Sequence, residues 1–74
     1  MSKLTNNQTL SVIAGDYVVK ATGALDVQYQ MDDEAFTTIT GASFATAGEG
    51  LITLPVCIVK CANAGANTLR IKKV

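Results

Sequence analysis

The sequence has no histidine and no tryptophan, and each absence narrows the range of possible functions. Histidine is the side chain used most often for proton transfer in catalysis, and a serine or cysteine nucleophile usually needs an adjacent base. Without tryptophan, and without basic residues interleaved with aromatic ones, the usual platform for stacking sugars or single-stranded nucleic acid is missing. We therefore expect that the chain is not an enzyme.

Cysteine is scarce as well, since the only two are Cys57 and Cys61. In a strand, two residues four positions apart share a face but lie roughly 13 Å apart. A disulfide needs Cα atoms within about 7 Å of each other. With no histidine and no third cysteine, the chain also lacks the remaining ligands of a zinc site. We expect both cysteines to be small buried side chains in a reducing compartment, and we expect no metal and no cofactor.

Charge is sparse and balanced. Six basic and six acidic residues give a net charge of zero, and only 16% of residues are charged, while 49% are hydrophobic. A neutral chain lacks the electrostatic footprint of a nucleic-acid-binding protein. A surface with few charges favours association. The composition therefore predicts a chain partly covered by neighbours, as in a homo-oligomer, with a small neutral monomer as the alternative.

Long hydrophobic runs are missing too. The most apolar window, "GLITLPVCIVK", is much shorter than the ~20 residues that a membrane span requires. The first ten residues hold no apolar stretch of the length of a signal peptide. We expect no membrane association, and we expect synthesis in the cytoplasm of the cell that makes the chain.

The sequence is rich in short segments of strand type, separated by glycine, asparagine or aspartate. This punctuation predicts an all-β fold, a small antiparallel β-sandwich or barrel of about 6–8 short strands. The clearest strand begins at Leu25, from which apolar and polar residues alternate without exception as far as Met31. Residues 1–7 carry little hydrophobic pattern and are predicted to be a flexible or extended arm, with a single sandwich domain over residues 8–74.

Three consecutive acids, Asp32, Asp33 and Glu34, follow that strand. They lack the Asp-x-Asp-x-Asp-Gly spacing of a calcium loop, so we interpret them first as the corner of a hairpin. A second strand, "AFTTIT", follows the corner, and "GASFATAGEG" is predicted to be a loop or a very short strand between turns. The expected core residues are Leu25, Val27, Tyr29, Met31, Phe36, Ile39, Leu54, Ile58, Leu69 and Ile71.

The segments "VQYQMDDEAFTTIT" and "GEGLITLPVCIVKCANAGANTLRI" together resemble the small β-sandwich structural proteins of tailed-bacteriophage virions, especially capsid decoration (cement) proteins. The resemblance covers residues 10–73 and lies in the order of strands and turns. Where those proteins often have Asp-Gly-Gly at the turn, this chain has the three acids. The resemblance implies a structural function: many copies on the outer capsid surface of the virion, bound to the major capsid protein or to other virion proteins, and stabilising the shell.

Two alternatives stay open at this stage. Within the same class, the chain is a phage tail, neck or fibre component. In another class, it is a small carbohydrate- or peptide-binding module, which would present Tyr17 or Phe44 to its ligand. For the structural function, the basic C-terminus of one copy could meet the acidic turn of another. The expected partner contacts are Lys3, Leu4, Asp32, Asp33, Glu34, Lys72 and Lys73.

Overall fold

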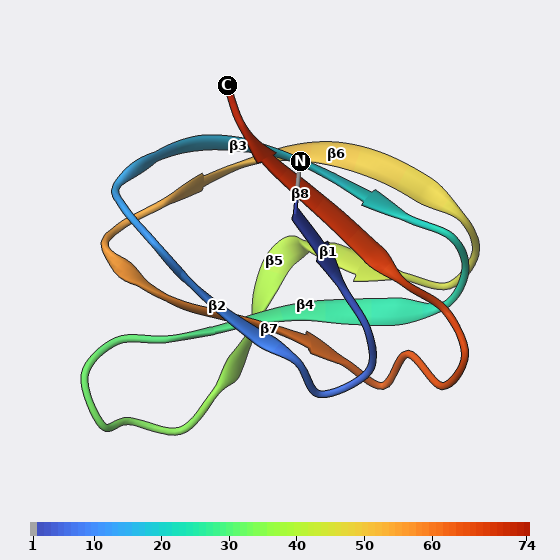
Figure 1. The fold of residues 1–74 in the computed structure, drawn as a ribbon, viewed down its shortest axis with the longest axis horizontal. Coiled ribbons are helices and arrows are strands. Elements are labelled where there is room, and N and C mark those ends of the chain that lie inside the picture. Colours follow the sequence, from blue (N-terminus) through green and yellow to red (C-terminus); the bar gives the residue numbers. More distant parts are fainter. Residues whose placement is uncertain (1) are drawn as a thin grey trace.

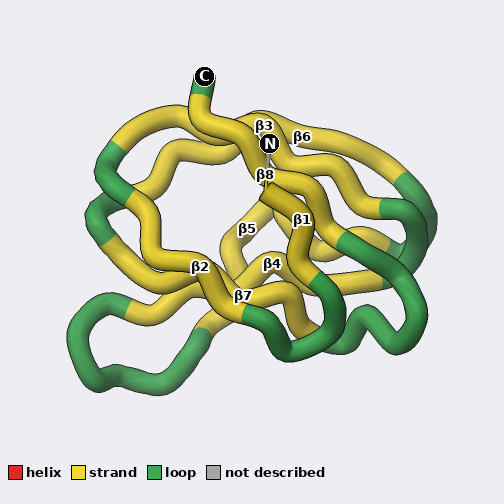
Figure 2. Tube along the Cα trace, viewed as in Figure 1, coloured by secondary structure: helices red, strands yellow, loops and turns green. Residues whose placement is uncertain are grey.

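A computed structural model describes residues 2–74, which form strands joined by turns and loops (Figures 1 and 2). The eight strands are β1 (Ser2–Leu4), β2 (Thr9–Val12), β3 (Gly15–Ala21), β4 (Leu25–Gln30), β5 (Thr37–Phe44), β6 (Gly48–Leu54), β7 (Cys57–Ala62) and β8 (Leu69–Lys73). None of the described residues belongs to a helix, so this part of the chain contains no helix that could span a membrane.

The strands make two antiparallel sheets of four. The first sheet has the order β1-β8-β3-β6, and the second has the order β2-β7-β4-β5. Their apolar inner faces pack together, which is the arrangement of a small β-sandwich. The all-β fold predicted from the sequence is confirmed, and its strand number lies within the expected range.

One ladder of paired residues runs through both sheets. β2 pairs with β7 up to Val12 and Cys57, and β3 pairs with β6 from Gly15 and Leu54 onward. The same register holds on both sides, so residues 13–14 lie opposite residues 55–56 where the two chain segments leave one sheet and enter the other. Pro55 suits this place because proline has no backbone donor for a ladder.

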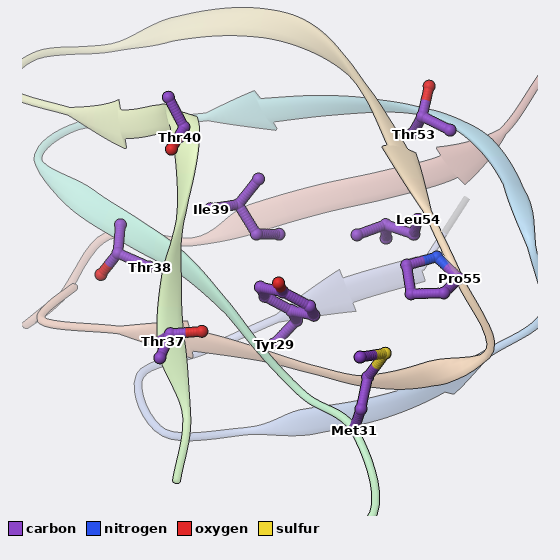
Figure 3. Close-up of a pocket in the computed structure, with 9 residues that line it drawn as sticks. All are labelled: Tyr29, Met31, Thr37, Thr38, Ile39, Thr40, Thr53, Leu54 and Pro55. Atoms are coloured by element: carbon purple, nitrogen blue, oxygen red, sulfur yellow. The ribbon is translucent and has the colours of Figure 1, made fainter. Parts of the chain in front are cut away.

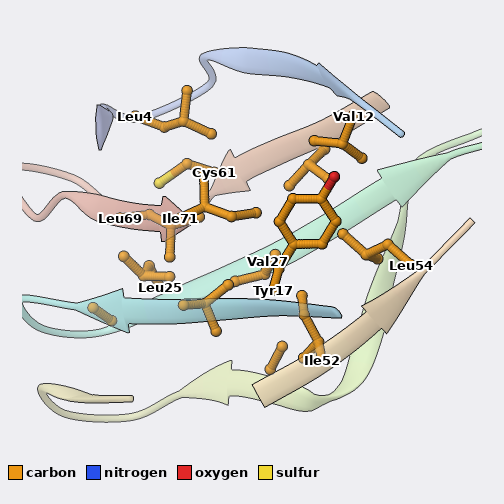
Figure 4. Packing of buried hydrophobic residues seen from close by; sticks show 14 of the residues in the cluster. Leu4, Val12, Tyr17, Leu25, Val27, Ile52, Leu54, Cys61, Leu69 and Ile71 are labelled. Carbon is orange, nitrogen blue, oxygen red and sulfur yellow. The ribbon is translucent and has the colours of Figure 1, made fainter. Parts of the chain in front are cut away.

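The core consists of apolar side chains from the inner faces of both sheets (Figure 4). Strands β3, β4, β7 and β8 contribute alternate residues, because successive side chains of a strand point to opposite faces. The largest side chains that are fully buried are Leu25, Leu69, Val19, Val27, Val59 and Cys61. Burial of a side chain of this size contributes about 1.5–3 kcal/mol, which makes this cluster the main source of stability in so short a chain.

Most of the expected core residues are confirmed, and three are wrong. Leu25, Val27, Leu54, Leu69 and Ile71 are buried, while Tyr29 and Ile39 are partly buried against the cluster. Ile58 faces outward, because β7 turns Cys57, Val59 and Cys61 inward instead. Met31 lies beyond the end of β4 and is 40% exposed. The half-buried Phe36 precedes β5, and its ring lies outside the core, 5.1 Å from the Lys60 Nζ.

Two segment predictions are also corrected. Within the predicted arm, Ser2–Leu4 forms strand β1, paired with β8 at the edge of the first sheet; Met1 lies outside the described residues. Residues 41–50, predicted to be a loop or a very short strand between turns, are instead the end of β5 and the start of β6, with a bend at residues 45–47 between them. Between Asp26 and Gln28 the pairing of β4 with β5 shifts register, and Gly41, with φ 84°, lies in this irregularity. Because glycine tolerates positive φ, the strand bends there and continues.

Candidate functional site

The residues expected to contact a partner lie in two separate places. Lys3, Lys72 and Lys73 are exposed on β1 and β8 of the first sheet. The three acids lie in the turn between β4 and β5 of the second sheet, and all three are exposed. The prediction that Leu4 contacts a partner is wrong. Its side chain is 6% exposed and belongs to the core, because this residue of β1 points toward the inside of the sandwich. A partner therefore has no access to Leu4.

The acidic turn is held by hydrogen bonds of its own. The Met31 backbone N–H donates to the Glu34 carboxylate over 3.3 Å, and the Gln30 side-chain amide donates to the Glu34 carbonyl over 2.6 Å. Asp32 has φ 57°, a left-handed conformation that aspartate adopts more readily than most residues. The turn joins two neighbouring antiparallel strands, so the interpretation of the acids as a hairpin corner is confirmed. The Asp32 and Asp33 carboxylates lie at the surface of this corner.

An apolar corner is the surface that sequence reasoning missed. It comprises Ile13 and Val56, which are 63% and 71% exposed, together with the exposed Pro55. Ile13 and Val56 occupy opposite positions where the ladder of β2–β3 and β6–β7 passes between the sheets. Solvent-exposed apolar residues that gather at one place mark interaction sites more often than scattered ones do. The only signal in the sequence was Pro55, which marks the point where a long apolar run is divided.

Beside this corner is an open groove of about 240 Å³ between the edge strands β5 and β6 (Figure 3). Its walls combine the hydroxyl groups of four threonines and one tyrosine with four apolar side chains, and they include no charged residue. Such a surface can donate and accept hydrogen bonds through its hydroxyl groups. The lining residues are Tyr29, Met31, Thr37, Thr38, Ile39, Thr40, Thr53, Leu54 and Pro55.

The two cysteines are structural. Both are free thiols, Cys61 is fully buried, and Cys57 is 7% exposed. Burial raises the pKa of each thiol, which leaves less of the reactive thiolate. Their expected status as small buried side chains is confirmed. Within residues 2–74 no three cysteine or acidic side chains gather in the way that a metal site requires.

Of the aromatic side chains named for a binding module, one is buried and the other is partly buried. Tyr17 is 5% exposed and belongs to the core, and Phe44 is partly buried against it. The Tyr17 hydroxyl donates a 2.7 Å hydrogen bond to the carbonyl of Ile13, so it supports the apolar corner from inside. A ligand at the groove would meet Tyr29 instead.

Asp26 ties three strands together on the outer face of the second sheet. Its carboxylate accepts a 2.5 Å hydrogen bond from the Ser43 hydroxyl on β5 and a 2.7 Å bond from the Asn63 side-chain amide, which follows β7. These two donors, Ser43 first, lower the pKa of Asp26. Because both of its oxygens are engaged, Asp26 has a structural role, and the other carboxylates of this sheet lie in the acidic turn.

Comparison of the chain with protein-family models, with curated proteins and with solved structures finds no match.

Proposed function

We propose that this chain is a non-enzymatic virion structural protein, most specifically a capsid decoration (cement) protein that binds the outer surface of a phage head and stabilises the shell. The observation that carries the proposal is the apolar corner, at which Ile13 and Val56 are exposed to solvent. Nearly half of the residues of this chain are hydrophobic, and many of these are buried in the core. In this proposal the corner docks on the major capsid protein. The protein is made in the host cytoplasm and resides on the capsid surface.

Hydrophobic burial supplies the binding energy in this proposal. Covering an exposed isoleucine or valine contributes up to about 1.5–3 kcal/mol each, before the cost of immobilising the partner is subtracted. One such contact is weak. A shell offers many equivalent positions, and a subunit that touches two neighbouring capsid proteins would also hold them together. The absence of a charged residue in the corner lets it pack without leaving an unpaired charge.

The proposal is tested by sedimenting the purified chain with empty heads of a tailed bacteriophage that lack their decoration protein. Val56→Lys should abolish co-sedimentation, since it places a charge at the apolar corner. Val74→Lys is the matched control, because Val74 is 73% exposed and lies at the C-terminal end, after β8. Binding by wild type and Val74→Lys but not by Val56→Lys supports the proposal. Equal binding by both variants, or none by wild type, contradicts it.

A phage tail, neck or fibre component is the alternative within this class, because the same corner could dock on a tail protein. Sedimentation with tail tubes in place of heads separates the two. A carbohydrate- or peptide-binding module is favoured by a different observation, the uncharged groove with its hydroxyl-rich wall. In that case oligosaccharides or extended peptides should shift the amide resonances of Thr38, Thr40 and Thr53, while Val56→Lys leaves those shifts unchanged.

A further inference from the structure

The neutral chain separates its charges between its two sheets. The strands of the first sheet hold five basic and two acidic residues, a formal charge of +3, whereas the second sheet with its β4–β5 turn holds one basic and four acidic residues, a formal charge of −3. The first set is Lys3, Lys20, Arg70, Lys72 and Lys73 with Asp16 and Glu49; the second is Lys60 with Asp26, Asp32, Asp33 and Glu34.

Three of the cations form a row across the first sheet. Lys3 pairs with Arg70, and Arg70 pairs with Lys20, so the three lie side by side on strands β1, β8 and β3. All three are exposed, and the row ends at Glu49, which pairs with Lys20 on the edge strand β6. Neighbouring strands are about 4.8 Å apart. Like charges directly opposite each other destabilise a sheet, and a carboxylate placed over the row would offset that cost.

The row borders a small apolar patch on the same face. Val18 pairs with Leu51 on one side and with Lys72 on the other, and Leu51 is 65% exposed. A partner that covers the row would therefore also cover Leu51, which adds a hydrophobic term to the electrostatic one. This face is separate from the apolar corner, because it lies on the outside of the first sheet and not at the crossing between the sheets.

The acidic turn and the basic row of one chain lie on different sheets. The turn belongs to the second sheet and projects beyond the lower left of the fold in Figure 1, whereas the row crosses strands β1, β8 and β3 of the first sheet. A row and a turn in direct contact would therefore belong to different copies.

We propose that the row of Lys3, Arg70 and Lys20 in one copy binds the Asp32–Asp33–Glu34 turn of a second copy. The outer strands of the row are about 10 Å apart, and the compact turn, closed by the bond from the Glu34 N–H to the Met31 carbonyl, fits within that width. The contact joins unlike surfaces, so in a pair one copy keeps its turn free and the other keeps its row free. Copies therefore associate head to tail, into a ring where the rotation closes and into a chain where it does not.

The first test measures the mass of the purified chain by sedimentation velocity over a range of protein and salt concentrations. At low salt the average mass should rise above the 7.7 kDa of one chain as protein concentration increases. Between about 10 mM and about 1 M salt the association should weaken by roughly an order of magnitude or more, because the screening length falls from about 30 Å to about 3 Å.

The second test neutralises each surface separately. Lys20→Gln with Arg70→Gln removes most of the row, and Asp32→Asn with Asp33→Asn removes most of the turn while keeping a residue type that accepts a positive φ. Each double variant alone should stay at the mass of one chain. An equimolar mixture should form pairs and stop, because only one functional row and one functional turn meet. Glu49→Gln is the control: it also removes a carboxylate but should leave association intact.

A chain that stays at the single-chain mass in low salt at high protein concentration would overturn the inference. So would association that strengthens with salt, or double variants that assemble like wild type. If the chain instead binds duplex DNA through Arg70 without self-association, the row is a nucleic-acid surface and the inference is also wrong. The result is independent of capsid binding, because Val56→Lys changes the corner and should leave the low-salt assembly as it is.

Discussion

The Tyr17 hydroxyl donates a 2.7 Å hydrogen bond to the backbone carbonyl of Ile13, which links a ring in the core to an exposed connection between the sheets. Tyr17 is buried and Ile13 is 63% exposed, although the two are four residues apart. The bond satisfies a part-buried carbonyl at the point where the chain leaves β2 for β3. It therefore holds the apolar corner in a fixed geometry.

Replacing Tyr17 by phenylalanine should lower the free energy of unfolding by about 1 kcal/mol, since the ring still packs but the Ile13 carbonyl loses its donor. Urea denaturation measures the change. Tyr29→Phe is the control, because that ring lies at the groove and is only partly buried. Equal effects of the two substitutions would show that the hydrogen bond to Ile13 has no particular weight.

Gly41 and Gly50 offer a matched pair on the edge strands. An added Cβ would meet no atom within 4 Å at either position, but only Gly41 has a positive φ, 84°. Gly41→Ala should therefore destabilise the fold by about 1–2 kcal/mol through backbone strain alone. Gly50→Ala should be neutral or slightly stabilising, because it restricts the unfolded chain. Similar melting temperatures for the two variants would contradict the assigned strain.

Asp26 predicts a dependence of stability on pH. Its pKa is lowered from the ordinary value of 3.8, so its contribution to folding is complete above that pH and is lost as the pH falls through the lower folded-state pKa. In the Asp26→Asn variant an amide group replaces the carboxylate, so a donor faces one of the two donors that Asp26 now accepts from. The variant should therefore be less stable than wild type at neutral pH. The difference should be less than about 1 kcal/mol, because both hydrogen bonds are exposed. At about pH 2 the difference should shrink. A constant difference across this range would exclude the assigned role.

The thiols of Cys57 and Cys61 should resist alkylation while the chain is folded. Both are buried, and burial raises the pKa of each, so little thiolate is available to the reagent. Iodoacetamide labelling followed by mass spectrometry should give unmodified protein in buffer and double modification in urea. Rapid labelling of one thiol in the folded chain would indicate a reactive cysteine and would weaken the proposal of a purely structural function.

Leu4 tests the assignment of residues 2–4 to the first sheet. Leu4→Ala should cost about 2 kcal/mol, near the lower end for removal of a buried leucine, because β1 lies at an edge. Lys3→Ala should change the stability little, since that side chain is exposed. Thermal unfolding distinguishes the two, and a negligible effect of Leu4→Ala would return this segment to the status of a free arm.

Local pattern was sufficient for the fold class and for part of the core. Leu25 and Val27 were placed correctly because strict alternation defines a strand and its buried face without knowledge of any other strand. The acidic turn was recognised for a similar reason, since three polar residues end the alternation and the next strand begins soon afterwards. These features depend on residues that are close together along the chain.

The apolar corner and the charge separation depend on pairing between distant residues. Lys3 lies beside Arg70, and Ile13 opposite Val56, only because the strands assemble in one particular order. In the run "CIVKCA" alternation is weak, so the partners of β7 decided that Cys57 turns inward and Ile58 outward. The sequence by itself determined that these segments are strands, because periodicity is a local property. Which side chains share a surface was decided by tertiary structure alone, because neighbours on a sheet come from the partner strand.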